Sequence, residues 1–115
     1  MYAEAINEYQ TAISLNGETT GGLIDLGYAY AMSGKRAEAL AILNKLKTSK
    51  GYVSPGGLAT LYAGLGDKEA AFQSLERAYS AHDIRLLSLK FDPHYDSLRS
   101  DPRFQELLRR VGLPQ

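Results

Sequence analysis

The sequence has no cysteine, no tryptophan, only four prolines, and no excess of either charge, with 13 basic and 13 acidic residues among 115. The lack of cysteine excludes disulfides, thiolate metal sites and cysteine nucleophiles. The charge balance excludes an overall basic field that would attract nucleic acid or an anionic membrane surface. No apolar run approaches the roughly 20 residues of a membrane-spanning helix, and the N-terminus lacks the regions of a signal peptide. We therefore predict a cytoplasmic protein that binds neither nucleic acid nor membrane.

What the sequence does contain is enough apolar material for one packed core, since 44% of its residues are hydrophobic. In the first 15 residues, Ala5, Tyr9 and Ala12 follow the i, i+4, i+7 spacing of one helix face. Gly17 comes next, and glycine ends helices because it takes a left-handed conformation without steric cost. These residues predict an amphipathic helix over residues 1–15.

A pattern of small and large residues then appears twice more along the chain. Ala39 lies 34 residues after Ala5, and Ala71 lies 32 residues after Ala39. Around them, the first copy reads Leu23-x2-Leu26-Gly27-x2-Tyr30, Gly34, Ala39-x3-Leu43, and the second reads Pro55-x2-Leu58-Ala59-x2-Tyr62, Gly66, Ala71-x3-Leu75. Gly27 and Ala39 are expected where two helices cross, because larger side chains would separate the helix axes.

This pattern resembles the tetratricopeptide repeat, whose period is about 34 residues. The resemblance implies an all-α fold of antiparallel helix-turn-helix repeats, a solenoid, closed by a C-terminal helical cap. It divides the chain into the second helix of a truncated repeat (1–17), a complete repeat (18–50), a degenerate repeat (51–83) and the cap (84–115). Because no first helix precedes residues 1–17, we expect the chain to be a segment of a longer protein.

Capping signals set the expected helix boundaries. Thr20 is the expected N-cap of a helix that runs to about Ser33, and a second helix covers residues 35–47 after Gly34. Ser54-Pro55 predicts the next start, although Gly56 and Gly57 weaken it by roughly 1 kcal/mol each relative to alanine. Further expected caps are Asp67 for a helix to about Ala81, Asp83 for 84–89, Asp92-Pro93 for 93–98, and Asp101-Pro102 for 102–111.

The segment from Phe91 to Pro114 is also similar to the tail that closes many bacterial multidomain proteins. In those proteins, tetratricopeptide repeats follow a kinase, cyclase or DNA-binding regulatory domain. The likeness covers about a quarter of the chain and suggests its origin more than an activity.

Residues that could carry chemistry are few. His82 and His94 have acidic neighbours, and an enzyme would need a polar cleft that joins one of them to Asp92 or Asp96. We favour a simpler interpretation, in which the aspartates cap helices and His82 meets the negative end of a helix dipole. No metal-ligand spacing, phosphate-binding loop or nucleophile motif is present. The arginines 99, 103, 109 and 110 alternate with acids, as on a solvated face. We predict no enzyme activity, no metal and no cofactor.

The resemblance instead implies binding of a protein or peptide. In this family the first helix of each repeat lines a concave groove that takes an extended peptide or a partner helix. Carried onto this chain, the groove positions are Ile24, Tyr28, Ala31, Met32, Thr60, Ala63 and Gly64. Members that clamp a C-terminal carboxylate use lysine, asparagine and arginine at such positions; none stands here, and Asp25 would repel the anion.

The sequence leaves the partner unidentified, and two further interpretations stay open. The repeats could act as a structural spacer or regulatory segment of a multidomain signalling protein, with no ligand of their own. The first helix could also promote self-association, since without a preceding helix we expect Ile6, Tyr9 and Ile13 to be partly uncovered.

Overall fold

A computed structural model describes residues 2–112, and every regular element in that range is a helix. The chain divides into two compact units, residues 1–53 and residues 54–115, each considered by itself below. Within the described range, no helix is both long and apolar enough to cross a bilayer. The predicted all-α class is thus confirmed.

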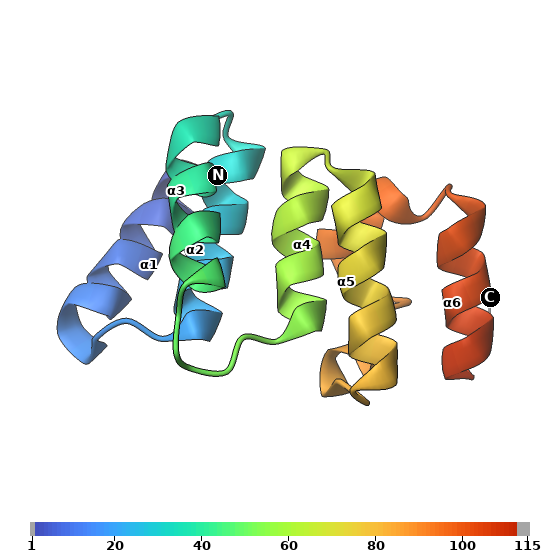
Figure 1. Ribbon diagram of the computed structural model, residues 1–115. Coiled ribbons are helices and arrows are strands. Elements are labelled where there is room, and N and C mark those ends of the chain that lie inside the picture. Colours follow the sequence, from blue (N-terminus) through green and yellow to red (C-terminus); the bar gives the residue numbers. More distant parts are fainter. Residues whose placement is uncertain (1, 113–115) are drawn as a thin grey trace. The chain divides into compact units, whose positions relative to one another are not determined.

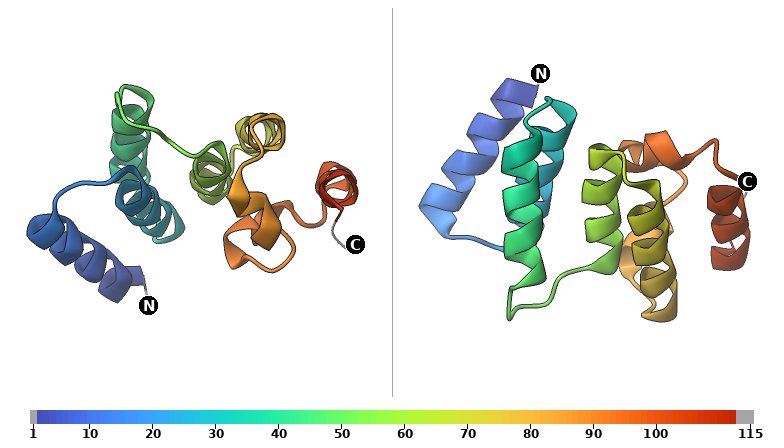
Figure 2. Two further views of the ribbon diagram at one scale, coloured as in Figure 1. Left: turned by 90° about the horizontal axis from the view of Figure 1, so that it is seen from below. Right: turned by 45° about the horizontal axis from the view of Figure 1, so that its top comes forward.

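The first unit holds three helices, α1 (Tyr2–Asn16), α2 (Thr20–Met32) and α3 (Arg36–Lys47). Helix α2 lies between the other two and packs against both, as the left view of Figure 2 shows. Gly17 and Gly34 turn the chain after α1 and α2 with φ of +84° and +83°. The predicted ends of these helices are therefore confirmed.

One capping prediction in this unit is wrong. The N-cap of α2 is Thr19, whose hydroxyl accepts a hydrogen bond from the Gly22 N–H at 3.0 Å. Thr20 is the first helical residue, and its hydroxyl donates to the Tyr52 carbonyl at 2.8 Å. Thr19 and Thr20 carry the same capping group, so local sequence does not distinguish them. The hydrogen bond from Thr20 to Tyr52 does distinguish them, but it is a tertiary contact that local sequence does not reveal.

The second unit begins with an antiparallel helix pair, α4 (Pro55–Leu65) and α5 (Lys68–Ser80), seen in Figure 1. Two 3₁₀ helices, η1 (Ile84–Ser88) and η2 (Pro93–Leu98), lead to α6 (Pro102–Val111). All five predicted caps accept a backbone N–H through their side chains: Ser54, Asp67, Asp83, Asp92 and Asp101. The boundaries expected from these signals hold to within one residue.

Two of the three recurring alanines lie in the cores of the units. Ala39 in α3 and Ala71 in α5 have no exposed surface, and each lies in the second helix of an antiparallel pair. Ala5, in α1, is half-buried. In the second unit, α4 and α5 share one apolar cluster with the two 3₁₀ helices and α6, and Tyr95 and Phe104 are its largest fully buried side chains.

The two glycines at the start of α4 do not prevent the helix because tertiary hydrogen bonds hold it. The Gly56 N–H donates to the Asp83 carboxylate at 3.0 Å, and its carbonyl accepts from the Tyr95 hydroxyl at 2.8 Å. A Cβ at Gly56 would lie 3.0 Å from Cβ of Arg85. The start of α4 therefore lies so close to η1 that a side chain at position 56 would crowd Arg85.

His82 is the only residue other than glycine with a positive φ among residues 2–112, at +54°. It stands two residues after the end of α5, as Gly34 stands two residues after the end of α2. The Asp83 N–H donates to the Ala78 carbonyl at 2.9 Å, which closes the helix end as a glycine would. The left-handed conformation costs a residue with a Cβ about 1–2 kcal/mol.

We therefore expect His82→Gly to stabilise the protein. The relief of strain, less the larger entropy that glycine loses on folding, should raise the free energy of unfolding by about 0.5–1 kcal/mol. Urea unfolding followed by circular dichroism measures the change. Gly66→Ala, at φ +81°, is the control and should lower the same quantity. A destabilised His82→Gly would contradict the strain at this position.

Candidate functional site

The groove residues predicted in the first unit all lie on α2, with different exposure. Ile24 is 2% exposed and belongs to the core, Tyr28 and Ala31 are half-buried, and Met32 is 43% exposed. Asp25, Tyr28 and Met32 follow the i, i+3, i+7 spacing of one helix face. We call Tyr28, Ala31 and Met32, together with Asp25, the α2 face.

The negative charge of Asp25 also acts on Tyr9, a residue of α1. Burial of the Tyr9 side chain, and next the negative charges of Asp25 and Glu8, raise the pKa of the Tyr9 phenol. Because Asp25 is the one charged residue of α2, the α2 face is mainly apolar with a single acidic group.

The predicted groove residues of the second unit lie on α4. Thr60 and Ala63 are buried, at 1% and 5% exposure, and Gly64 is half-buried. The Thr60 hydroxyl donates to the Gly57 carbonyl at 2.6 Å, within its own helix. Its polar group is therefore already satisfied.

The structure also contains a pocket of about 340 Å³ in the first unit that the sequence did not reveal. Its lining comes from α1, α2 and α3 and includes Gln10, Ile13, Leu23, Leu26, Tyr30 and Ile42. The Gln10 amide donates to the Tyr30 hydroxyl at 2.7 Å, and Lys45 pairs with Glu18 at the rim. No motif in the sequence indicates this pocket, because its apolar residues also fit an ordinary core.

Of the three side chains of α1 that were predicted to be partly uncovered, two are partly exposed and one is buried. Ile6 is 6% exposed, while Tyr9 and Ile13 are half-buried. The exposed large apolar residue of α1 is Leu15, at 78%. Self-association through this helix stays a prediction.

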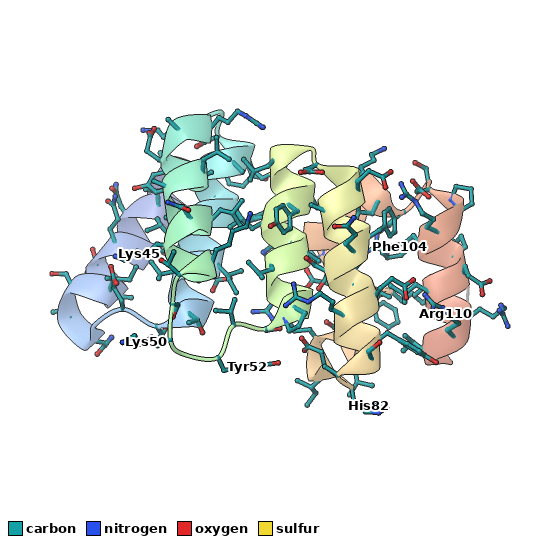
Figure 3. All side chains as sticks on the ribbon, in the orientation of Figure 1. Lys45, Lys50, Tyr52, His82, Phe104 and Arg110 are labelled. Carbon is teal, nitrogen blue, oxygen red and sulfur yellow. The ribbon has the colours of Figure 1, made fainter. Side chains whose placement is uncertain are left out.

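A second pocket, of about 530 Å³, lies where α5 ends, η1 follows and α6 makes its last turn. Its lining includes Tyr79, His82, Ile84, Leu87, Arg110 and Val111. Figure 3 labels His82 at the end of α5 and Arg110 on α6. We call this the α5–η1–α6 pocket. The sequence missed it because its residues come together only when the C-terminal segment folds back.

Arg99, Arg103, Arg109 and Arg110 each pair with an acidic side chain. Arg103 lies 2.9 Å from both Glu69 and Asp101, and its hydrogen bonds lower the pKa of Asp101 to about 2. Arg99 pairs with Asp96 at 2.8 Å, and Arg109 pairs with Glu106. Arg103 and Arg109 are exposed, as expected of a solvated face, whereas Arg99 is half-buried and also donates to the carbonyls of Lys90 and Asp92 at 2.6 and 2.7 Å.

Two of these arginines form a repeated arrangement between α5 and α6, which run parallel (Figure 1). Arg103 pairs with Glu69 and stacks on Phe72, with its guanidinium carbon 4.3 Å from the ring centroid. Seven residues later, Arg110 pairs with Glu76 and lies 4.9 Å from the centroid of Tyr79. We call these two sets of contacts the α5–α6 rungs.

Of the histidine and aspartate side chains considered for catalysis, the structure brings His94 and Asp92 together, whereas His82 lies at the end of α5 and Asp96 pairs with Arg99. His94 Nδ1 lies 2.6 Å from Asp92 Oδ1, and the same oxygen accepts the His94 backbone N–H at 2.9 Å. Asp92 is thus the cap of η2, as predicted. Among residues 2–112, no group of three or more potential ligands is arranged to hold a metal ion.

Comparison of the chain with protein-family models, with curated proteins and with solved structures gives no match in any of the three. The functional argument therefore depends on the sequence pattern and on the surfaces described above.

Proposed function

We propose that this protein is a scaffold of tetratricopeptide-like helical hairpins that binds a peptide or helix of a partner protein in the cytoplasm. The α2 face supports the proposal more than any other feature. It exposes 43% of Met32 next to the half-buried ring of Tyr28 on a helix with a single charged residue. An exposed apolar side chain beside an aromatic ring is the kind of anchor point that partner proteins use.

The arrangement favours an apolar or aromatic partner side chain over an acidic one. Such a side chain would contact Met32 and the edge of Tyr28, while Asp25 at the other end of the face would repel a carboxylate. Within the proposal, the buried Ile24, Thr60 and Ala63 support the helices and do not touch the partner. The competing function is a spacer without a ligand.

The double variant Tyr28→Ala, Met32→Ala tests the proposal. We expect quantitative pull-down to show that proteins bound by the wild type are retained at least about tenfold less, as loss of an anchor side chain requires. Leu40→Ala is the control, because Leu40 is 42% exposed on α3 and lies outside the α2 face. Circular dichroism verifies that the double variant is folded. Equal retention by the double variant and the wild type would favour the spacer.

A further inference from the structure

The pocket of about 340 Å³ among α1, α2 and α3, which we call the first-unit pocket, has the composition of a small-molecule site. Such sites are concave and mostly apolar, with a few polar groups that orient the ligand, over about 300–1,000 Å³. The apolar side chains that line this pocket are Ile13, Leu23, Leu26, Ala41 and Ile42. Its polar lining residues are Gln10, Glu18, Tyr30, Glu38 and Lys45.

Three of these polar residues gather at one end of the pocket. Helices α2 and α3 are antiparallel and joined by a short turn, so Tyr30, near the end of α2, lies level with Glu38 in the first turn of α3. The Gln10 side chain reaches the same end, because its amide donates to the Tyr30 hydroxyl at 2.7 Å. Within residues 2–112, the Glu38 carboxylate and the Gln10 side-chain oxygen accept no hydrogen bond, and Glu38 forms no ion pair. Both oxygens are therefore available as acceptors for a ligand.

The charges of the lining favour a cationic ligand. Lys45, labelled in Figure 3, is the basic residue of the lining, and it is paired with Glu18. The negative charge of Glu38 is therefore not balanced by another lining residue. Helices α1 and α2 contain no lysine, arginine or histidine, and the other basic residues of α3 do not line the pocket. The dipoles of α2 and α3 oppose each other where one helix ends and the next begins, so Glu38 decides the sign of the charge at this end.

We propose that the first-unit pocket binds a small hydrophobic primary amine in its protonated form. The apolar body of the ligand covers Leu23, Leu26 and Ile42, which keep 7%, 7% and 8% of their surface exposed. Its ammonium group donates charge-assisted hydrogen bonds to the Glu38 carboxylate and a hydrogen bond to the Gln10 side-chain oxygen. Shape and charge thus select an amine over a neutral or acidic molecule of the same size.

The first-unit pocket and the α2 face are separate surfaces. At about 100° per residue, Leu23, Leu26 and Tyr30 point to one side of α2, whereas the residues of the α2 face are centred on the opposite side. A small ligand in the pocket therefore does not reach the α2 face, and the inference does not depend on the proposed function.

The test uses NMR titration of the full chain with three compounds of similar size and different charge: phenethylamine, phenethyl alcohol and hydrocinnamate. We expect phenethylamine to shift the amides of the residues that line the pocket, and the shifts to saturate. The neutral alcohol should bind about tenfold more weakly, because the charge-assisted hydrogen bonds are lost. Hydrocinnamate should bind more weakly still, because Glu38 repels its carboxylate.

A matched pair of variants separates the charge at the pocket from other effects. Glu38→Gln should weaken the binding of phenethylamine about tenfold and leave that of phenethyl alcohol unchanged. Glu4→Gln is the control, because Glu4 is also an exposed acid in the first turn of its helix but does not line the pocket. It should leave the binding of both compounds unchanged. Circular dichroism verifies that both variants are folded.

Three results would overturn the proposal: no saturable shifts with phenethylamine, equal affinity for the amine and the alcohol, or wild-type affinity for the amine in Glu38→Gln. A short lysine-containing peptide provides a further test. If the peptide shifts the lining amides and phenethylamine does not, the pocket is a peptide site and the small-molecule proposal is wrong.

Discussion

Replacing Tyr95 by alanine should lower the free energy of unfolding by about 4 kcal/mol, the usual cost of truncating a large buried aromatic residue. Tyr95 has no exposed surface, and its ring centroid lies 6.5 Å from that of Phe104 in the core of the second unit. Its hydroxyl also holds the Gly56 carbonyl at the start of α4. Since small domains are stable by only about 5–15 kcal/mol, urea unfolding should show a large shift of the midpoint.

Two further variants divide this effect into its parts. Tyr95→Phe keeps the ring and removes the hydroxyl, so it should cost only about 1 kcal/mol. Tyr52→Ala removes a tyrosine that is 73% exposed and should change the free energy of unfolding by less than about 0.5 kcal/mol. If Tyr95→Ala costs no more than Tyr52→Ala, the C-terminal segment does not fold onto α4 and α5 as described.

The second large effect is expected at Asp83, where alanine should cost about 3 kcal/mol. The substitution removes the acceptor of three hydrogen bonds and leaves the buried Gly56 N–H without a partner. Asp67→Ala is the matched control, because Asp67 is an exposed cap with one bond, to the Ala70 N–H. Its loss should cost about 1 kcal/mol. Similar losses for both variants in urea unfolding would show that Asp83 is no more than a local cap.

Asp83 should also contribute to sensitivity to acid. Burial alone would raise its pKa, but hydrogen bonds from Ser54 and from the N–H groups of Arg85 and Gly56 outweigh burial and lower the pKa. A lowered pKa means that this stabilisation is present above the pKa of the unfolded chain and is lost as pH falls through the folded value. The difference in unfolding free energy between wild type and Asp83→Asn should therefore shrink at the acidic end of a pH series.

The sequence predicted the secondary structure well because most helix signals in this chain are local. Ser54-Pro55, Asp92-Pro93 and Asp101-Pro102 each combine a capping side chain with a proline at the first helical position, and each begins a helix. The glycine that ends each of four helices is equally local. Thr19 and Thr20 show the limit of this information, since only the contact with Tyr52 distinguishes them.

The surfaces were much harder to predict, because exposure depends on residues that are distant in sequence. Ile24 and Thr60 were assigned to a groove by their repeat position, but the degree of burial comes from the neighbouring elements. Asp83 was recognised as a cap, whereas its bonds to Ser54 and Gly56 span 29 and 27 residues. The α5–η1–α6 pocket joins three elements, and no short motif signals such a meeting.

The α5–α6 rungs limit how this chain can change in length. The second rung lies seven positions after the first on both helices, which is close to two full turns, so Arg103 and Arg110 point in nearly the same direction from α6. Deleting or inserting one residue between them would turn Arg110 about 100° around the helix axis. A change in the number of residues between Arg103 and Arg110 would therefore break one rung even if every remaining side chain were kept.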